Sequence, residues 1–144
     1  MICTSTVTLR RADWEAAEGM DESLQRAEDY DLWLRLTRYG RKAHVLPDVL
    51  AVYEDAGDRL SADELAMVEA TLDVLDRSAF PGFLEPTWLD RLGRLEAVRA
   101  HLVMKERGDF REGRRLALKA IGGSPRRRAA WTALARAVLR TKRG

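Results

Sequence analysis

The sequence predicts an α+β fold with few strands, followed by an all-α helical extension. Residues 2–9 are rich in β-branched types and predict a strand, and the apolar stretches of 42–53 on either side of Pro47 predict a bent or broken strand pair. From residue 86 onward, apolar residues recur at helical spacing. A chain of 144 residues, 46% of them hydrophobic, can form one ordinary domain with an appendage.

Turn and cap residues separate the elements of the first part. A short helix over 12–18 ends at Gly19, because glycine readily takes the left-handed conformation of a helix end. A second helix runs from about Glu28 to Gly40. A third opens at the Ser-x-x-Glu capping box of 61–64 and reaches about Arg77. The prolines that follow make 78–86 the best linker, and we expect three segments, 1–60, 61–85 and 86–144.

The segment 86–144 reads as three helices. The first ends at Gly108, and a capping box at Asp109 starts the second. Ser124 followed by Pro125 predicts the N-cap of the third helix. Its apolar residues are Trp131, Leu134, Ala135 and Val138, and we expect Trp131 in the core together with Trp88 and Phe110.

Charge is divided unevenly along the chain. Residues 1–85 hold 9 Lys and Arg against 18 Asp and Glu, a net charge of −9, whereas residues 86–144 hold 16 against 5, a net charge of +11. Two alternatives remain open: the two parts attract each other, or the basic face meets an anionic partner. An acidic membrane surface fits that face, and without a recognised binding motif we do not expect nucleic acid as a partner.

The chain carries one cysteine and has no apolar run near the roughly 20 residues that span a bilayer. It also lacks the basic-then-apolar pattern of a signal peptide. We therefore expect a cytoplasmic protein that can lie peripherally at the inner membrane surface.

The acidic start of the second helix is the candidate site. Asp29 falls on the same face as Leu32, Trp33 and Leu36, where an unpaired carboxylate costs free energy unless something compensates it. Asp31 falls beside Arg35, one turn on, and predicts a structural ion pair. For the whole cluster, a simpler interpretation is an acidic helix N-terminus that stabilises the helix dipole.

The order of several short motifs resembles the second half of family 2 glycosyltransferases. They are the stretch from Ser5 to Arg11, the run Gly19-Met20-Asp21-Glu22-Ser23-Leu24, the segment Glu28-Asp29-Tyr30-Asp31-Leu32-Trp33-Leu34-Arg35-Leu36, Gly40, and Pro47 to Tyr53. The resemblance covers roughly residues 2–61. It implies a GT-A fold and transfer of a sugar from a nucleotide-sugar donor to a saccharide or lipid-linked acceptor.

The resemblance also implies roles for residues. Asp29 would be the catalytic base, Glu28 would bind or orient the acceptor, and Thr4 and Thr6 would lie beside the acceptor. A divalent metal, Mg²⁺ or Mn²⁺, is implied as cofactor. Where many members place a metal-binding His after the equivalent of Tyr53, this chain offers Asp55.

Family members carry an N-terminal nucleotide-binding half with an Asp-x-Asp motif, and here nothing precedes Met1. We therefore expect a fragment, a chain with a misplaced start or a degenerate relative, inactive without the donor-binding half. The alternative function is a non-catalytic helical interaction module that binds an anionic partner or a protein through the basic C-terminal face.

Overall fold

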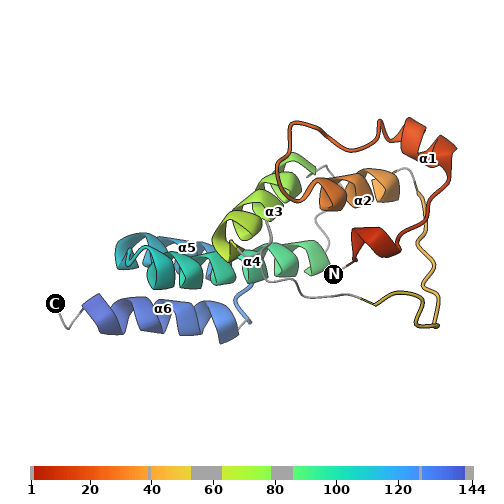
Figure 1. Cartoon of the computed structure of the whole chain (residues 1–144). Coiled ribbons are helices and arrows are strands. Elements are labelled where there is room, and N and C mark those ends of the chain that lie inside the picture. Colours follow the sequence, from red (N-terminus) through yellow and green to blue (C-terminus); the bar gives the residue numbers. More distant parts are fainter. Residues whose placement is uncertain (1, 39, 53–62, 79–85, 127, 142–144) are drawn as a thin grey trace. The chain divides into compact units, whose positions relative to one another are not determined.

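The computed structural model describes residues 2–38, 40–52, 63–78, 86–126 and 128–141. The chain divides into two compact units, Met1–Ala62 and Asp63–Gly144 (Figure 1). The first unit contains the 3₁₀ turn η1 (Thr4–Thr6) and the helices α1 (Arg11–Ala16) and α2 (Glu28–Arg38). The second contains α3 (Glu64–Ser78), α4 (Pro86–Glu106), α5 (Phe110–Gly123) and α6 (Arg128–Thr141).

The predicted α+β class is wrong, because the described residues form helices and turns and no strand. The run 2–9 contains η1, in which the Thr6 hydroxyl donates to the carbonyl oxygen of Cys3 at 2.7 Å. Residues 42–52 of the second run are exposed and form neither helix nor strand. A strand is stable only when a neighbour completes its hydrogen-bond ladder, and these two runs do not pair with each other. Composition alone therefore overstated the strands.

The first unit has a small core. Ala17, Leu32 and Leu36 are buried there, and Leu9, Met20 and Trp33 pack against them. Gly19 has a φ of 67°, and a Cβ at this position would lie 3.1 Å from the Trp14 ring. Glycine is therefore required at this turn for both its conformation and its size.

The second unit is a set of packed helices. α5 packs against both α4 and α6, α6 also packs against α4, and α3 lies on α4 (Figure 1). Short connections make α4 and α5, and then α5 and α6, antiparallel neighbours. The buried residues of its largest core cluster are Leu65, Ala100, Leu102, Val103, Met104, Leu116, Ala117, Ala133 and Ala137. Many of these are alanines, which let the helix backbones approach closely.

Two predicted caps have different outcomes. The Asp109 cap is confirmed, because its carboxylate accepts from the Glu112 backbone N–H at 2.9 Å and starts α5. The Ser124 cap is wrong: Ser124 ends α5, and its hydroxyl donates to Asp90 at 3.1 Å. Ser61 of the predicted capping box before α3 lies outside the described residues. At the start of α3, the Asp63 carboxylate accepts a hydrogen bond from the Ala66 N–H at 2.9 Å.

The predicted core position of Trp131 is also wrong. Ala130, Ala133 and Ala137 of α6 face the core, while Trp131 is 52% exposed. Trp88 is buried as expected. None of the described helices is long and apolar enough to cross a membrane.

Candidate functional site

Three carboxylates crowd the first turn of α2, namely Glu28, Asp29 and Asp31. The turn before the helix is tight, because Ala27 is 5% exposed and has a φ of 59°. The unpaired N–H groups at a helix start favour negative charge, which explains why this acidic sequence can form the first turn of α2. These side chains nevertheless have different partners.

Asp29 joins two distant parts of the first unit. Its Oδ2 accepts a hydrogen bond of 2.5 Å from the Thr4 hydroxyl, 25 residues earlier in the chain. Its Oδ1 accepts from the Tyr30 backbone N–H at 2.7 Å. Asp29 is only partly buried. A carboxylate held by two donors and still reachable from solvent has the orientation that a general base needs.

The other residues assigned by resemblance lie differently. Glu28 precedes Asp29 in the first turn of α2 and makes no hydrogen bond or ion pair among the described residues. Thr6 is directed into its own turn, toward Cys3. The structure therefore brings Thr4, but not Thr6, to Asp29. Asp55 lies outside the described residues.

A divalent metal requires several oxygen ligands directed at one point. Within the described ranges, no group of three or more His, Cys, Asp or Glu side chains could hold a metal ion. The described residues therefore do not bring such a set of ligands together.

Asp31 and Arg35 make an ion pair on the other side of α2. The Asp31 Oδ2 lies 2.7 Å from one terminal nitrogen of Arg35, and their side chains are 14% and 25% exposed. The Arg35 guanidinium also donates to the carbonyl oxygen of Ala17 and, at 2.7 Å, to that of Gly19. Arg35 thus binds two carbonyl groups of the turn that directly follows α1. The sequence pattern predicted the ion pair, but it did not indicate these backbone contacts.

No family model, curated protein or solved structure matches this chain. The functional proposal therefore depends on the geometry around Asp29 and on the motifs of the sequence. Two further charged features lie in the second unit.

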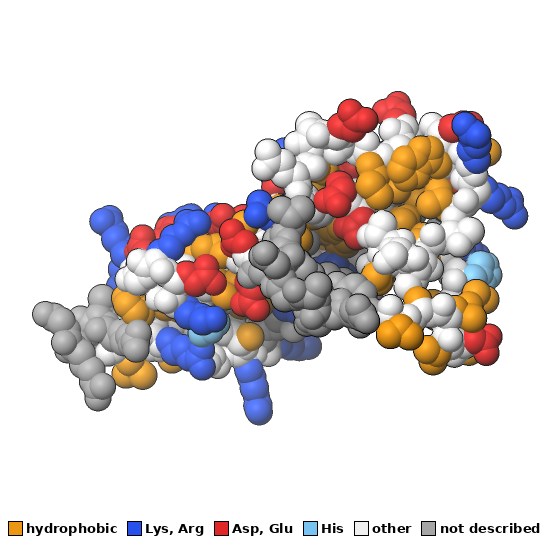
Figure 2. Space-filling view, in the orientation of Figure 1, with side chains coloured by type: hydrophobic (Ala, Val, Ile, Leu, Met, Phe, Trp, Pro, Cys, Tyr) orange, Lys and Arg blue, Asp and Glu red, His pale blue; other side chains and the backbone are white. Residues whose placement is uncertain are grey.

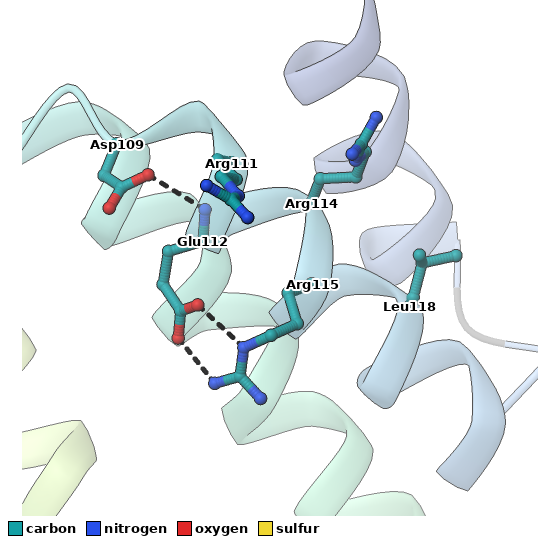
Figure 3. A pocket seen from close by; sticks show the side chains of 6 residues that line it. All are labelled: Asp109, Arg111, Glu112, Arg114, Arg115 and Leu118. Atoms are coloured by element: carbon teal, nitrogen blue, oxygen red, sulfur yellow. Dashed lines mark hydrogen bonds and ion pairs between the residues drawn. The ribbon is translucent and has the colours of Figure 1, made fainter.

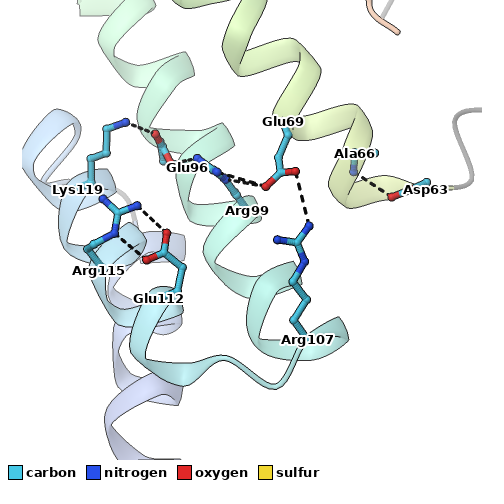
Figure 4. A network of polar contacts seen from close by, with 9 residues as sticks. All are labelled: Asp63, Ala66, Glu69, Glu96, Arg99, Arg107, Glu112, Arg115 and Lys119. Carbon is cyan, nitrogen blue, oxygen red and sulfur yellow. Dashed lines mark hydrogen bonds and ion pairs between the residues drawn. The ribbon is translucent and has the colours of Figure 1, made fainter. Parts of the chain in front are cut away.

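A network of charges crosses α3, α4 and α5 (Figure 4). Glu96 is 5% exposed, and its Oε1 binds the Lys119 ammonium at 2.6 Å, while Oε2 has no hydrogen bond. Arg99 bridges to Glu69 at 3.2 Å. The network lines a groove of about 610 Å³. The sequence analysis did not predict this network. Glu96 lies between the buried positions Gly93 and Ala100 of α4, where a carboxylate indicates a cationic partner.

The second feature is a shallow hollow of about 350 Å³ on α5, lined by Asp109, Arg111, Glu112, Arg114, Arg115 and Leu118 (Figure 3). Arg115 binds Glu112 through two hydrogen bonds of 2.6 and 2.7 Å. This hydrogen bonding lowers the pKa of Glu112 and raises that of Arg115. Arg111, Arg114 and Arg115 are all exposed, and of these three the hollow's ion pair engages Arg115.

Proposed function

We propose that residues 1–60 are the acceptor-binding and catalytic-base part of a glycosyltransferase similar to family 2. The observation that carries the proposal is the hydrogen bond of 2.5 Å between Thr4 and Asp29. It joins the two segments that the resemblance assigns to the acceptor site. The proposal concerns the side chains around the start of α2 and requires no sheet within the described residues.

The chemistry assigns one role to each group. The Asp29 carboxylate takes the proton of an acceptor hydroxyl while that oxygen forms a bond to the anomeric carbon of the donor sugar. The bond from the anomeric carbon to the diphosphate breaks, and the nucleoside diphosphate leaves with its electron pair. Thr4 orients Asp29, and the neighbouring Glu28 binds a second acceptor hydroxyl. The resemblance implies inversion at the anomeric carbon.

The donor has to be brought to Asp29 by a nucleotide-binding half of the kind that the family carries. We therefore expect no sugar transfer by this chain alone with nucleotide sugars of uridine, guanosine or thymidine. The acceptor is a saccharide or a lipid-linked saccharide, and the protein would work at the cytoplasmic side of the inner membrane. A partner half would also contribute to the binding of any metal.

Acceptor binding by the isolated chain tests the proposal. The chain is screened on an array of free and lipid-linked saccharides, and the best ligand is titrated while backbone amide signals are followed by NMR. We expect the shifts to concentrate at Thr4, Asp29 and Tyr30. Asp29→Ala should weaken binding at least about tenfold, because a hydrogen bond to a charged group is worth about 1.5–3 kcal/mol.

Glu22→Ala is the matched control, since it removes an exposed carboxylate from the same unit outside the site. Its affinity for the saccharide should equal that of the unchanged chain. Amide spectra of both variants report whether the unit remains folded. The absence of any saccharide ligand, or a folded Asp29→Ala variant that binds as well as the control, would contradict the proposal.

A further inference from the structure

The outer side of α6 exposes several large apolar side chains. The helix turns its alanines inward and leaves Trp131, Val138 and Leu139 at 52%, 38% and 66% exposure. Trp131 and Val138 are seven residues apart and share one face, and Leu139 adjoins it. The indole N–H of Trp131 donates to the carbonyl oxygen of Pro125 at 2.8 Å, which holds the ring at the surface.

The outer face of α5 combines one apolar residue with cations. Arg111, Arg114 and Leu118 are spaced three and four residues apart, so they project from the same side of the helix (Figure 3). Leu118 is 53% exposed, and both arginines are exposed. In the space-filling view, Lys and Arg side chains project from the second unit, with hydrophobic side chains and also Asp and Glu side chains between them (Figure 2).

The charge of this end of the chain has a single sign. Residues 113–144 contain ten Lys and Arg and no Asp or Glu. Arg126, Arg128 and Arg136 are exposed along or just before α6. Such a surface repels a second copy of itself and attracts a partner that is both negative and apolar.

We propose that the outer faces of α5 and α6 dock on an anionic lipid bilayer, with Trp131, Val138, Leu139 and Leu118 entering the headgroup region. Helices that lie in the plane of a membrane combine basic residues with Trp and Leu in this way. Tryptophan in particular favours the boundary between water and lipid. A single-stranded nucleic acid would need several aromatic platforms, whereas this surface presents one Trp among aliphatic side chains. The inference is independent of the proposed transferase activity.

Vesicle flotation with the full chain tests the docking. Vesicles of phosphatidylcholine are compared with vesicles that also contain phosphatidylglycerol, at about 0.1 M salt, where surface charges still act over about 10 Å. We expect the chain to float with the anionic vesicles only and to dissociate at about 1 M salt. Arg111→Gln combined with Arg114→Gln should weaken binding about twenty-five-fold, since each cation near such a surface is worth about fivefold.

Leu139→Gln should weaken binding about tenfold if the apolar face enters the lipid. The matched controls lie in the first unit: Leu50→Gln changes a leucine that is 73% exposed, and Arg10→Gln with Lys42→Gln removes two exposed cations. Both controls should float normally. The proposal would be overturned by loss of flotation in the controls as well, or by equal binding to uncharged vesicles. It would also be overturned if single-stranded RNA displaced the chain while Leu139→Gln had no effect.

Discussion

Arg35 shows how one side chain positions the candidate site. Its guanidinium binds the Asp31 carboxylate and the carbonyl groups of Ala17 and Gly19, so it joins the end of α1 to the middle of α2. Asp29 lies on the same helix and holds Thr4. The two aspartates therefore have different partners: Asp31 binds Arg35, whereas Asp29 binds Thr4 and is the residue to which the proposal assigns the acceptor.

We expect Arg35→Met to destabilise the first unit by about 2 kcal/mol, because it leaves a partly buried carboxylate and two carbonyl groups without a donor. The Leu32 and Leu36 methyl signals, followed by NMR through a urea titration, measure the loss. Arg11→Gln is the control, since the side chains of its pair with Glu15 are 91% and 62% exposed. That change should stay within about 0.5 kcal/mol. Equal effects of the two substitutions would contradict the role given to Arg35.

At the scale of elements, the contact between α4 and α5 depends on glycine. A Cβ at Gly113 would lie 2.3 Å from Met104 Cγ and 3.3 Å from the Ala100 carbonyl oxygen, whereas a Cβ at Gly122 meets nothing within 4 Å. Glycine normally weakens a helix by about 1 kcal/mol relative to alanine. At Gly113 the close approach of the two helices outweighs that cost, and at Gly122 it does not.

Gly113→Ala should therefore destabilise the second unit by about 1–3 kcal/mol, because Met104 and the α4 backbone have to move. Gly122→Ala on the same helix should be neutral or stabilise the unit by up to about 0.5 kcal/mol. Urea unfolding followed by far-UV circular dichroism compares the two variants. Stabilisation by both would show that α5 does not pack as closely on α4 as the structure indicates.

The sequence predicted the helices well because their signals are local. The Asp109 cap and the helical spacing on either side of it lie within a few residues of the elements that they define. Strands depend on a partner elsewhere in the chain, so the β-branched run 2–9 gave a wrong prediction. The face of α6 was mispredicted for another reason: tight helix packing favours Ala130 over the more hydrophobic Trp131. For the candidate site, resemblance selected Asp29, but only the fold could show its contact with Thr4.

At the scale of the molecule, the two units differ in how much apolar surface they bury. The described core of the first is a small cluster around Leu32. In its irregular segment 42–52, Val45, Val49 and Val52 are each 91% exposed. The second unit has a larger cluster around Leu116 that spans all four of its described helices. Burial of apolar surface is the main stabilising term, so the units should differ in stability.

Amide hydrogen exchange of the full chain measures this difference. We expect the amides of α4 and α5 to exchange at least about a hundredfold more slowly than those of α2, because opening the second unit exposes more apolar surface. Residues 42–52, which are exposed and have no regular structure, provide the unprotected reference within the same sample. Protection of α2 equal to that of α4 would mean that the chain unfolds as one cooperative body. A saccharide that binds at Asp29 should slow exchange in α2 and leave α4 and α5 unchanged, because ligand binding stabilises the unit that holds the ligand.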